Sequence, residues 1–345
     1  MIGFTRIACA AALPAVLMTS AGAQAQSADG FYKGKQLQIF VAGSAGGGID
    51  LGARLVSRFL GKYLPGNPAV PVQDMPGAGG IRVLEYLATV APRDGTQIGA
   101  FSTGPLLDQM ITTRQVSYKT TDFTAVGALE KDVSFCATWN KSPVKTVEAA
   151  RERVTTLGGT GAGSSTDIEP MVLNDVLGTK LKVISGYPGT QETILAIERG
   201  EVDGRCAFGW SSMNASKPEW LPKKMVHLLV QIGLQKHPRL PDVPLALDLA
   251  KTEADKQLMR VVATPLAISR PYLAPPNLPP ERTADLRKAF MAALADPELR
   301  ADFRKMTTED PEPTDGATMQ KLLADMYSVP QSVQNRLRNI VNNTK

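Results

Sequence analysis

Histidine and cysteine, which build most metal sites and many catalytic sites, are scarce in this sequence. Its 345 residues include two histidines and three cysteines. No cluster of histidine and carboxylate residues has the spacing of a metal site. The first glycine-rich turn lacks the spacing of a dinucleotide-binding loop, and no P-loop lysine follows it. The sequence therefore predicts neither a bound metal nor a cofactor.

A strong excess of charge and long apolar runs are also lacking. The 38 lysines and arginines against 33 aspartates and glutamates give a net charge of only +5. These basic residues are dispersed and form no stripe interleaved with aromatic residues, so nucleic acid is not expected as a partner. No run of apolar residues is long enough to cross a bilayer.

The first 25 residues have the pattern of a secretory signal peptide. Arg6 is followed by an apolar run over residues 7–18, and two small-x-small cleavage patterns lie at 21–23 and 23–25. Cys9 lies before most of the apolar run, so a lipoprotein attachment site is not expected. The sequence therefore predicts a secreted protein from which residues 1–25 are removed.

Two cysteines, Cys136 and Cys206, remain after the predicted signal peptide, and both lie in strand-like surroundings. A secreted protein matures in an oxidising compartment, which favours a disulfide between them. The sequence leaves open whether their Cα atoms come within the roughly 7 Å that a disulfide requires.

The chain is organised around a glycine-rich turn near its start. An apolar run over residues 37–41 predicts a buried strand, the turn 43–48 follows, and an amphipathic helix extends to Leu64. A strand, a glycine turn and a helix start together favour anion binding, because the first helical N–H groups lack partners and carry the positive end of the helix dipole. The alternative is a tight turn that needs glycine only for its backbone angles.

Alternation of strands and helices continues and predicts two α/β domains with mainly parallel sheets. Domain 1 is assigned residues 30–130 and 257–345, and domain 2 residues 131–256. We expect the last helices to pack back on domain 1. The predicted strands are 70–73, 97–101, 126–129, 133–138, one ending at 157, 181–184, 202–208, 226–232 and 261–268. The predicted helices are 81–90, a short piece reaching 110, 147–153, 166–177, 191–199, 280–294, 297–306, 316–326 and 329–341.

Two further turns rich in glycine and hydroxyl residues precede predicted helices, at 158–166 and 186–190. Thr166 and Glu169 fit a capping box for the helix that ends at Leu177, and Gly178 fits its C-terminal cap. If the helix starts of both domains face one crevice, they form an anion-binding cleft.

At this point the chain resembles the periplasmic solute receptors of tripartite tricarboxylate transporters, the Bug or TctC-like family. The motifs follow one another in the family order over residues 30–330, and in series they are specific. They are Tyr32–Lys35 (YKGK), Gly46–Asp50 (GGGID), Pro76–Gly80 (PGAGG), Ala91–Gly95 (APRDG), Tyr187–Thr190 (YPGT), Gly200–Gly204 (GEVDG) and Leu240–Pro244 (LPDVP).

The resemblance implies a two-domain, periplasmic-binding-protein-like (Venus flytrap) fold with a two-strand hinge that closes on a small organic acid. It also implies a monomer in the periplasm that passes a carboxylate to the membrane permease subunits of a tripartite tricarboxylate transporter. The ligand-binding positions carried over are Ser44, Gly46, Gly47, Gly48, Asp50, Thr103, Thr160, Gly161, Ser164, Ser165, Thr166, Gly189 and Thr190.

One position departs from the family pattern. Many members carry an aspartate a few residues after the Val202-Asp203 pair, whereas this chain has Arg205. An arginine suits a bidentate clamp on a second carboxylate, and the alternative is a structural ion pair. Trp210 either lines the pocket beside the ligand body or belongs to the core.

An enzyme is not expected. Ser44 follows a strand in a turn that is one residue away from a nucleophile elbow, so a serine hydrolase is the catalytic alternative. Such an enzyme needs a histidine, and His227 and His237 are better explained as surface or structural residues. Ser142 to Lys145 matches an S-x-x-K pattern but lacks the partner motifs of that class. A receptor that acts on a membrane sensor is the remaining alternative to transport.

Overall fold

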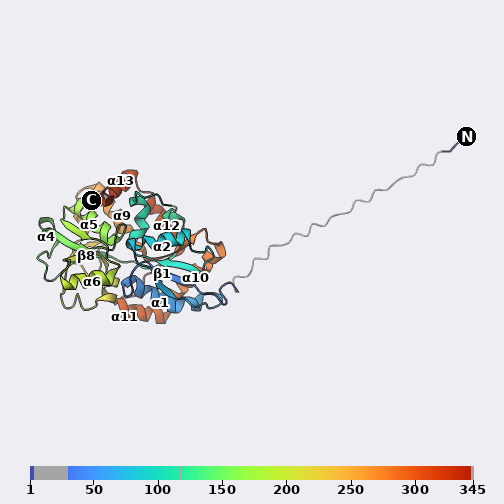
Figure 1. Cartoon of the computed structure of the whole chain (residues 1–345), viewed down its shortest axis with the longest axis horizontal. Coiled ribbons are helices and arrows are strands. Elements are labelled where there is room, and N and C mark those ends of the chain that lie inside the picture. The colour runs from blue at the N-terminus through green and yellow to red at the C-terminus, as the bar shows by residue number, and fades with distance from the viewer. Residues whose placement is uncertain (4–29, 117, 343–345) are drawn as a thin grey trace.

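The computed structural model describes residues 1–3, 30–116 and 118–342, so nearly all of the predicted signal peptide lies outside the described residues. Figure 1 shows two α/β lobes side by side, each with a central sheet and surrounding helices. The predicted two-lobed α/β fold is confirmed. No helix in the described residues combines the length and the apolar character needed to cross a membrane.

The first lobe is built on a sheet of six strands in the order β11-β4-β10-β3-β1-β2. Strand β1 is parallel to β2 and β3, whereas β10 runs antiparallel to β3 and β4, and β11 antiparallel to β4. The strands are β1 (Gln38–Val41), β2 (Val72–Asp74), β3 (Gln97–Ala100), β4 (Phe123–Glu130), β10 (Ser269–Pro276) and β11 (Thr314–Asp315).

The second lobe is built on a sheet of five strands in the order β7-β6-β8-β5-β9. Strand β6 is parallel to β7 and β8, but β5 runs antiparallel to β8 and β9. In the first sheet β10 and β11 run against the other four strands, and in the second β5 alone runs against the other four. Most strands of each sheet therefore point the same way, as expected, but both sheets are mixed. The strands are β5 (Ser134–Trp139), β6 (Thr155–Gly158), β7 (Leu181–Ile184), β8 (Gly204–Gly209) and β9 (Val226–Ile232).

The predicted strand over 261–268 is wrong. Residues Glu253–Ala263 form helix α9, which begins with a capping box between Thr252 and Asp255, and the 3-10 turn η5 (Thr264–Ile268) follows. The strand of this region is β10, which contains three prolines, at positions 271, 275 and 276. Prolines in a sequence argue against predicting an interior strand. The sheet accommodates them because pairing between β10 and β4 is irregular, with two register shifts.

Helices cover both faces of each sheet, because their apolar residues gather on one side. In α1, for example, Leu55, Val56, Phe59 and Leu60 are buried. The first sheet is covered by α1 (Gly48–Tyr63), α10 (Pro280–Ala295) and α11 (Pro297–Thr307) on one face and by α2 (Ile81–Thr89) and α12 (Gly316–Tyr327) on the other. The second is covered by α4 (Val147–Glu152) and α5 (Ser165–Leu177) on one face and by α6 (Thr190–Arg199) and α7 (Trp210–Ser216) on the other. The remaining elements are α3 (Asp108–Ile111), α8 (Ala246–Leu249), α13 (Gln331–Asn342), η2 (Ala78–Gly80), η3 (Gly104–Leu107) and η4 (Thr120–Asp122).

The chain passes between the lobes twice, from β4 to β5 and from η5 to β10. These two crossing segments lie against each other. The N–H of Asp132 donates to the carbonyl of Leu266 at 3.0 Å, and Ser269 pairs with Glu130. The domain limits assigned from the sequence, 130/131 and 256/257, stay a prediction.

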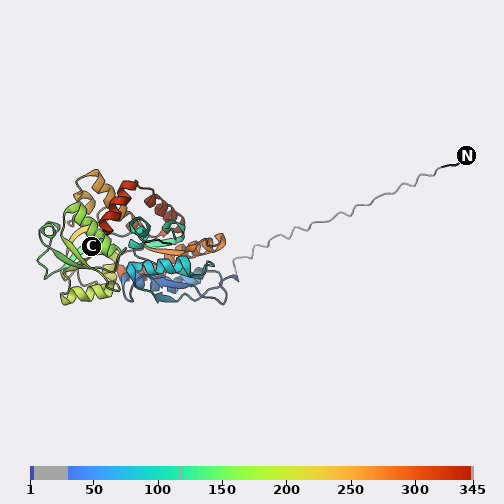
Figure 2. The ribbon, with the colours of Figure 1, turned by 45° about the horizontal axis from the view of Figure 1, so that its top comes forward.

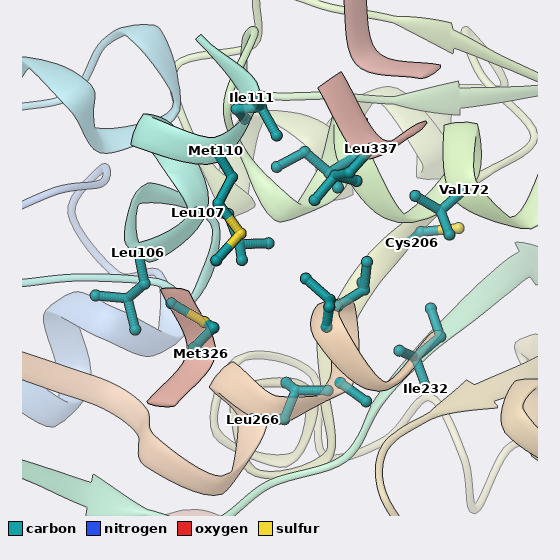
Figure 3. Packing of buried hydrophobic residues seen from close by; sticks show 14 of the residues in the cluster. Leu106, Leu107, Met110, Ile111, Val172, Cys206, Ile232, Leu266, Met326 and Leu337 are labelled. Carbon is teal, nitrogen blue, oxygen red and sulfur yellow. The ribbon is translucent and has the colours of Figure 1, made fainter. Parts of the chain in front are cut away.

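The final helix, α13, does not pack on the first lobe alone. It lies against α3 of the first lobe and against α5 and α9 (Figure 2). Arg336 on α13 pairs with Asp175 of α5 and with Asp255 of α9, each at 2.6 Å. The expectation that the last helices pack back on domain 1 is therefore too simple. Figure 3 shows an apolar cluster that includes α13, in which Leu337 lies between Met110 and Leu107 of the first lobe and Val172 of the second.

Cys136 and Cys206 lie on the neighbouring strands β5 and β8 and are joined as a disulfide, with their Cα atoms 3.9 Å apart. Both side chains are fully buried. The bond therefore ties two adjacent interior strands of the second sheet, as the cysteine count predicts.

Replacing both cysteines by alanine is expected to lower the free energy of unfolding by about 2–4 kcal/mol, because the bond constrains a long loop of the unfolded chain. Urea denaturation of the two proteins measures the difference. Mass spectrometry of the unreduced, alkylated protein is expected to show no label at either position, and labelling of both would contradict the bond.

Candidate functional site

A cavity of about 100 Å³ lies between the two lobes. It is enclosed by turns that follow strands of both sheets and by the two crossing segments. The lining residues are Ala42, Gly43, Ile49, Gly77, Gly79, Gly80, Ser102, Thr103, Asp132, Ser134, Thr160, Ser164, Ser165, Thr166, Glu169, Pro188, Gly189, Thr190, Arg205, Ala207, Phe208, Gly209, Ser212, Leu266, Ser269 and Arg270.

The second lobe presents two helix starts to the cavity. Ser165 and Thr166 open α5, and Thr190 opens α6. The Thr166 hydroxyl accepts from the N–H of Thr160 at 2.9 Å and lies 2.7 Å from the Ser164 hydroxyl, so the turn holds its hydroxyl groups in fixed places. Unpaired N–H groups and the positive end of each helix dipole make this wall favourable for an anion.

The two lobes touch through polar groups around the cavity. The hydroxyls of Thr103 and Ser165 lie 2.9 Å apart, and the N–H of Gly79 donates to the carbonyl of Thr160 at 3.2 Å. The Ser44 hydroxyl donates to the Glu192 carboxylate at 2.8 Å. The lobes are therefore in a closed arrangement.

The structure brings eight of the fifteen predicted ligand-binding residues to the cavity wall. These are Thr103, Thr160, Ser164, Ser165, Thr166, Gly189, Thr190 and Arg205. The other seven lie beside the cavity or away from it, and they are Ser44, Gly46, Gly47, Gly48, Asp50, Gly161 and Trp210.

The first glycine turn faces the other lobe more than the cavity. A side chain at Gly48 would overlap Ser212 of α7. The Asp50 carboxylate accepts from the N–H of Gly46 at 2.7 Å and pairs with Arg54 at 2.7 Å. Asp50 therefore shapes the turn. The glycines of this turn do allow a close approach of another group, as expected. In the described residues that group is the second lobe.

Trp210 belongs to the packing behind the cavity. Its ring stacks on His237 with centroids 4.6 Å apart, and 6% of its surface is exposed. Of the two interpretations offered by the sequence, the core position fits the structure. Gly161 is also off the wall, with its N–H donating to Asp167 at 3.3 Å.

Arg205 projects from β8 into the cavity wall, with only 4% of its surface exposed. Its Nη1 donates to the Thr193 hydroxyl at 2.8 Å, and Nε and Nη2 make longer bonds to backbone carbonyls. Its guanidinium lies over the Phe208 ring at 4.7 Å. Burial lowers the pKa of Arg205 to about 10, and attraction to Glu169 opposes that shift. Arg205 forms no ion pair in the described residues, so the structural ion pair that the sequence left open is not observed.

Glu169 is a cavity residue to which the sequence assigns a different role. Helix α5 begins after Ser164, and the expected capping box of Thr166 and Glu169 does not form. The Glu169 carboxyl group instead accepts from the Ser134 hydroxyl at 2.9 Å and from the N–H of Ala207 at 2.9 Å. Burial raises the pKa of Glu169 to about 8. A helical carboxylate close to an N-terminus is typical of a cap, and only tertiary contacts distinguish the two roles.

Charged residues on the crossing segments, which the sequence did not indicate, complete the wall. The Arg270 guanidinium pairs with Glu130 at 2.9 Å and donates to the Ser211 hydroxyl at 2.9 Å. Asp132 accepts from the same hydroxyl at 3.1 Å. Burial, and then repulsion by Glu130, raise the pKa of Asp132 to about 8. The Nη1 atom of Arg270 has no hydrogen-bond partner in the described residues.

Three glycines after β2, Gly77, Gly79 and Gly80, also line the cavity. All three have positive φ angles, which only glycine adopts readily. The Pro76–Gly80 motif was a signal for them, although the sequence did not identify them as ligand contacts.

The arrangement of helix starts, hydroxyl groups and arginines can hold an anion. Ser44 donates to Glu192, and neither histidine lines the cavity. Over the described ranges, no group of histidine, cysteine and carboxylate residues could hold a metal ion.

Asp132→Asn is expected to stabilise the protein increasingly as the pH rises from about 4 to 8. The raised pKa means that the folded protein binds a proton that the unfolded chain has released, so the contribution of Asp132 to stability is full below its unfolded pKa and is lost through this range. Relative to wild type, the free energy of unfolding of the variant should rise by at most about 1.4 kcal/mol per pH unit. Denaturation at several pH values measures it. Exposed Asp248→Asn is the control, and parallel profiles for wild type and both variants would contradict the prediction.

Solved structures of similar fold cover nearly the whole chain. The periplasmic binding protein BugD aligns with a TM-score of 0.71 at 19% identity, over 88% of this chain and 97% of the other. MatC from Rhodopseudomonas palustris, solved with bound malate, aligns with a TM-score of 0.68 at 19% identity, over 89% and 99%. Rpa4515 of R. palustris, solved with adipate, aligns with a TM-score of 0.67 at 18% identity, over 89% and 97%.

A family model described as "Tripartite tricarboxylate transporter family receptor" matches residues 53–336. The match includes parts of both lobes, both crossing segments and the first half of α13. This chain therefore belongs to the receptor family of the tripartite tricarboxylate transporters.

Proposed function

We propose that this protein is a noncatalytic, monomeric solute receptor of the periplasm that captures a small organic carboxylate between its lobes. It then passes the ligand to the membrane permease of a tripartite tricarboxylate transporter. Residues 1–25 serve as the cleaved signal peptide. The observation that carries the proposal is the cavity between the lobes, with helix starts and buried arginines in its wall.

The charges around the cavity favour an anion over a cation. Arg270 is balanced by Glu130, whereas Arg205 has no counter-ion in the described residues. The raised pKa values of Asp132 and Glu169 keep both carboxyl groups largely protonated at pH 7. A net positive wall with hydroxyl and N–H donors then attracts a carboxylate. Malate and adipate in two similar structures belong to this chemical class.

Binding is coupled to closure because the donors come from both lobes. Thr103 of the first lobe and Ser165 of the second lie next to each other on the wall. A ligand that contacts both lobes stabilises the closed state by its differential affinity for that state. The crossing segments around Asp132 and Leu266 serve as the hinge in this proposal.

A thermal-shift screen with mono-, di-, tri- and aromatic carboxylates is expected to give a ligand-dependent rise in melting temperature, because the ligand binds only the folded protein. No carboxylate should be consumed when the mixtures are assayed afterwards. An esterase activity that disappears in Ser44→Ala would instead support the hydrolase alternative. No shift with any carboxylate would contradict the proposed function.

Arg205→Ala is expected to weaken binding of a dicarboxylate by about 1.5–3 kcal/mol, the range for a lost hydrogen bond to a charged group. The affinity for a monocarboxylate that occupies only the helix-start wall should change much less. Calorimetry with matched C4 acids measures both affinities, and circular dichroism checks the fold. Equal losses for both ligands would remove the assigned role from Arg205.

A further inference from the structure

Arg205 and Glu169 share one part of the cavity wall, and neither forms an ion pair in the described residues. Both are nearly fully buried, with 4% and 2% of their surfaces exposed. A buried charge without a partner is costly, and such groups are normally paired or neutral. Two of them lining one cavity point to a ligand that satisfies both.

The donors of Arg205 are only partly used. A guanidinium carries five N–H groups, and three are taken by the Thr193 hydroxyl and the carbonyls of Cys206 and Ala207. Two N–H groups, one on each Nη atom, therefore carry no hydrogen bond within the described residues, and Arg205 lines the cavity. The contact with the Phe208 ring at 4.7 Å holds the plane of the guanidinium in place.

The neighbours of Glu169 supply hydrogen bonds without supplying positive charge. From β5 the Ser134 hydroxyl donates, and from β8 the N–H of Ala207 donates. The charged groups that face the same cavity are Arg205 on β8, Asp132 before β5 and Arg270 on β10. Arg270 pairs with Glu130 and not with Glu169. With no cation in direct contact, the neutral acid is the favoured form of Glu169 at neutral pH.

We propose that Arg205 and Glu169 bind one carboxylate group of the ligand together, with Arg205 giving its two free N–H groups and Glu169, in its acid form, giving an O–H. This inference rests on the proposed function and adds the ligand's charge state to it. The ligand is a fully ionised dicarboxylate, with its first carboxylate at the helix starts and its second at this pair. Its binding retains or takes up one proton on Glu169.

The alternative ligand for this corner, a zwitterion with an ammonium group, gives the opposite dependence on pH. An ammonium group would need ionised Glu169, so its affinity would rise as Glu169 loses its proton. A dicarboxylate needs the proton, so its affinity falls. The pH dependence therefore identifies the class of ligand.

The test begins with succinate, malate and adipate, and continues with the tightest binder, measured by calorimetry from pH 7 to 9.5. These acids are fully ionised throughout this range, so a pH dependence comes from the protein. Because the pKa of Glu169 in the ligand-free protein is about 8, the affinity is expected to fall about 30-fold between pH 7 and pH 9.5. Heats in two buffers of different ionisation enthalpy should show uptake of most of one proton at pH 8.5.

Three variants assign the proton. Glu169→Gln keeps a neutral donor, so it should bind but lose most of the pH dependence and of the proton uptake. Glu152→Gln, an exposed control in the same lobe, should retain both. Asp132→Asn removes the other carboxyl group of the cavity wall with a raised pKa, so the pH dependence that this variant retains belongs to Glu169.

The results separate the inference from the proposed function. Binding that is independent of pH, or that strengthens with pH, overturns the role of Glu169 and leaves the receptor function in place. The same holds if Glu169→Gln retains the full pH dependence. If Glu169→Gln fails to fold, proton uptake by the wild-type protein decides, and zero uptake at pH 8.5 overturns the inference. No binding of any of the three acids at any pH contradicts the proposed function itself.

Discussion

The close approach of turns from the two lobes is the constraint on which the cavity depends. Gly104 lies against the backbone at Ser164 and Ser165, and Gly189 lies against Ser44. A side chain at either glycine would push the lobes apart and separate the hydroxyls of Thr103 and Ser165. Small residues at these contacts therefore allow the closed arrangement. Wall side chains such as Ser164, Glu169 and Arg205 are buried in it, and hydrogen bonds and charges act more strongly there than they do at a surface.

Electrostatics then decides what the closed space accepts. If Asp132, Glu169 and Glu130 were all ionised beside the two guanidiniums, the site would carry one net negative charge and would disfavour an anion. Burial shifts the balance, because the pKa values of Asp132 and Glu169 rise while the guanidinium of Arg205 stays charged at pH 7. The same desolvation that penalises a buried carboxylate thus creates the positive character of the wall.

Local patterns in the sequence predicted much of the fold. Strands β7 and β9 have the predicted bounds, and Gly178 caps α5 with a left-handed conformation. Such features depend on neighbours in the sequence. Strand β10 was missed because its three prolines fit only through its irregular pairing with β4, which is a tertiary feature.

In the site, too, local features were predicted from the sequence and features that depend on tertiary contacts were missed. The turns before α5 and α6 were predicted because glycine, serine and threonine at helix starts form a local signal. Arg270 and Asp132 were not indicated, because they reach the wall only through the crossing of the chain between the lobes. Glu169 was predicted to be part of a helix cap because its actual partners, Ser134 and Ala207, are distant in sequence.

The two kinds of contact between the lobes determine how they can separate. Near the cavity the contacts are hydrogen bonds, such as those of Ser44 and Gly79, which water can replace at a net cost of roughly 0.5–1.5 kcal/mol each. Beneath α13 the contact is an apolar cluster that includes Met110 and Leu337 (Figure 3), and exposing it costs about 25 cal/mol for each Å². The proposed opening therefore breaks the polar side and keeps the apolar side closed. In this proposal the axis of motion lies near α13 and the crossing segments, and the ligand contacts both lobes on the side that opens.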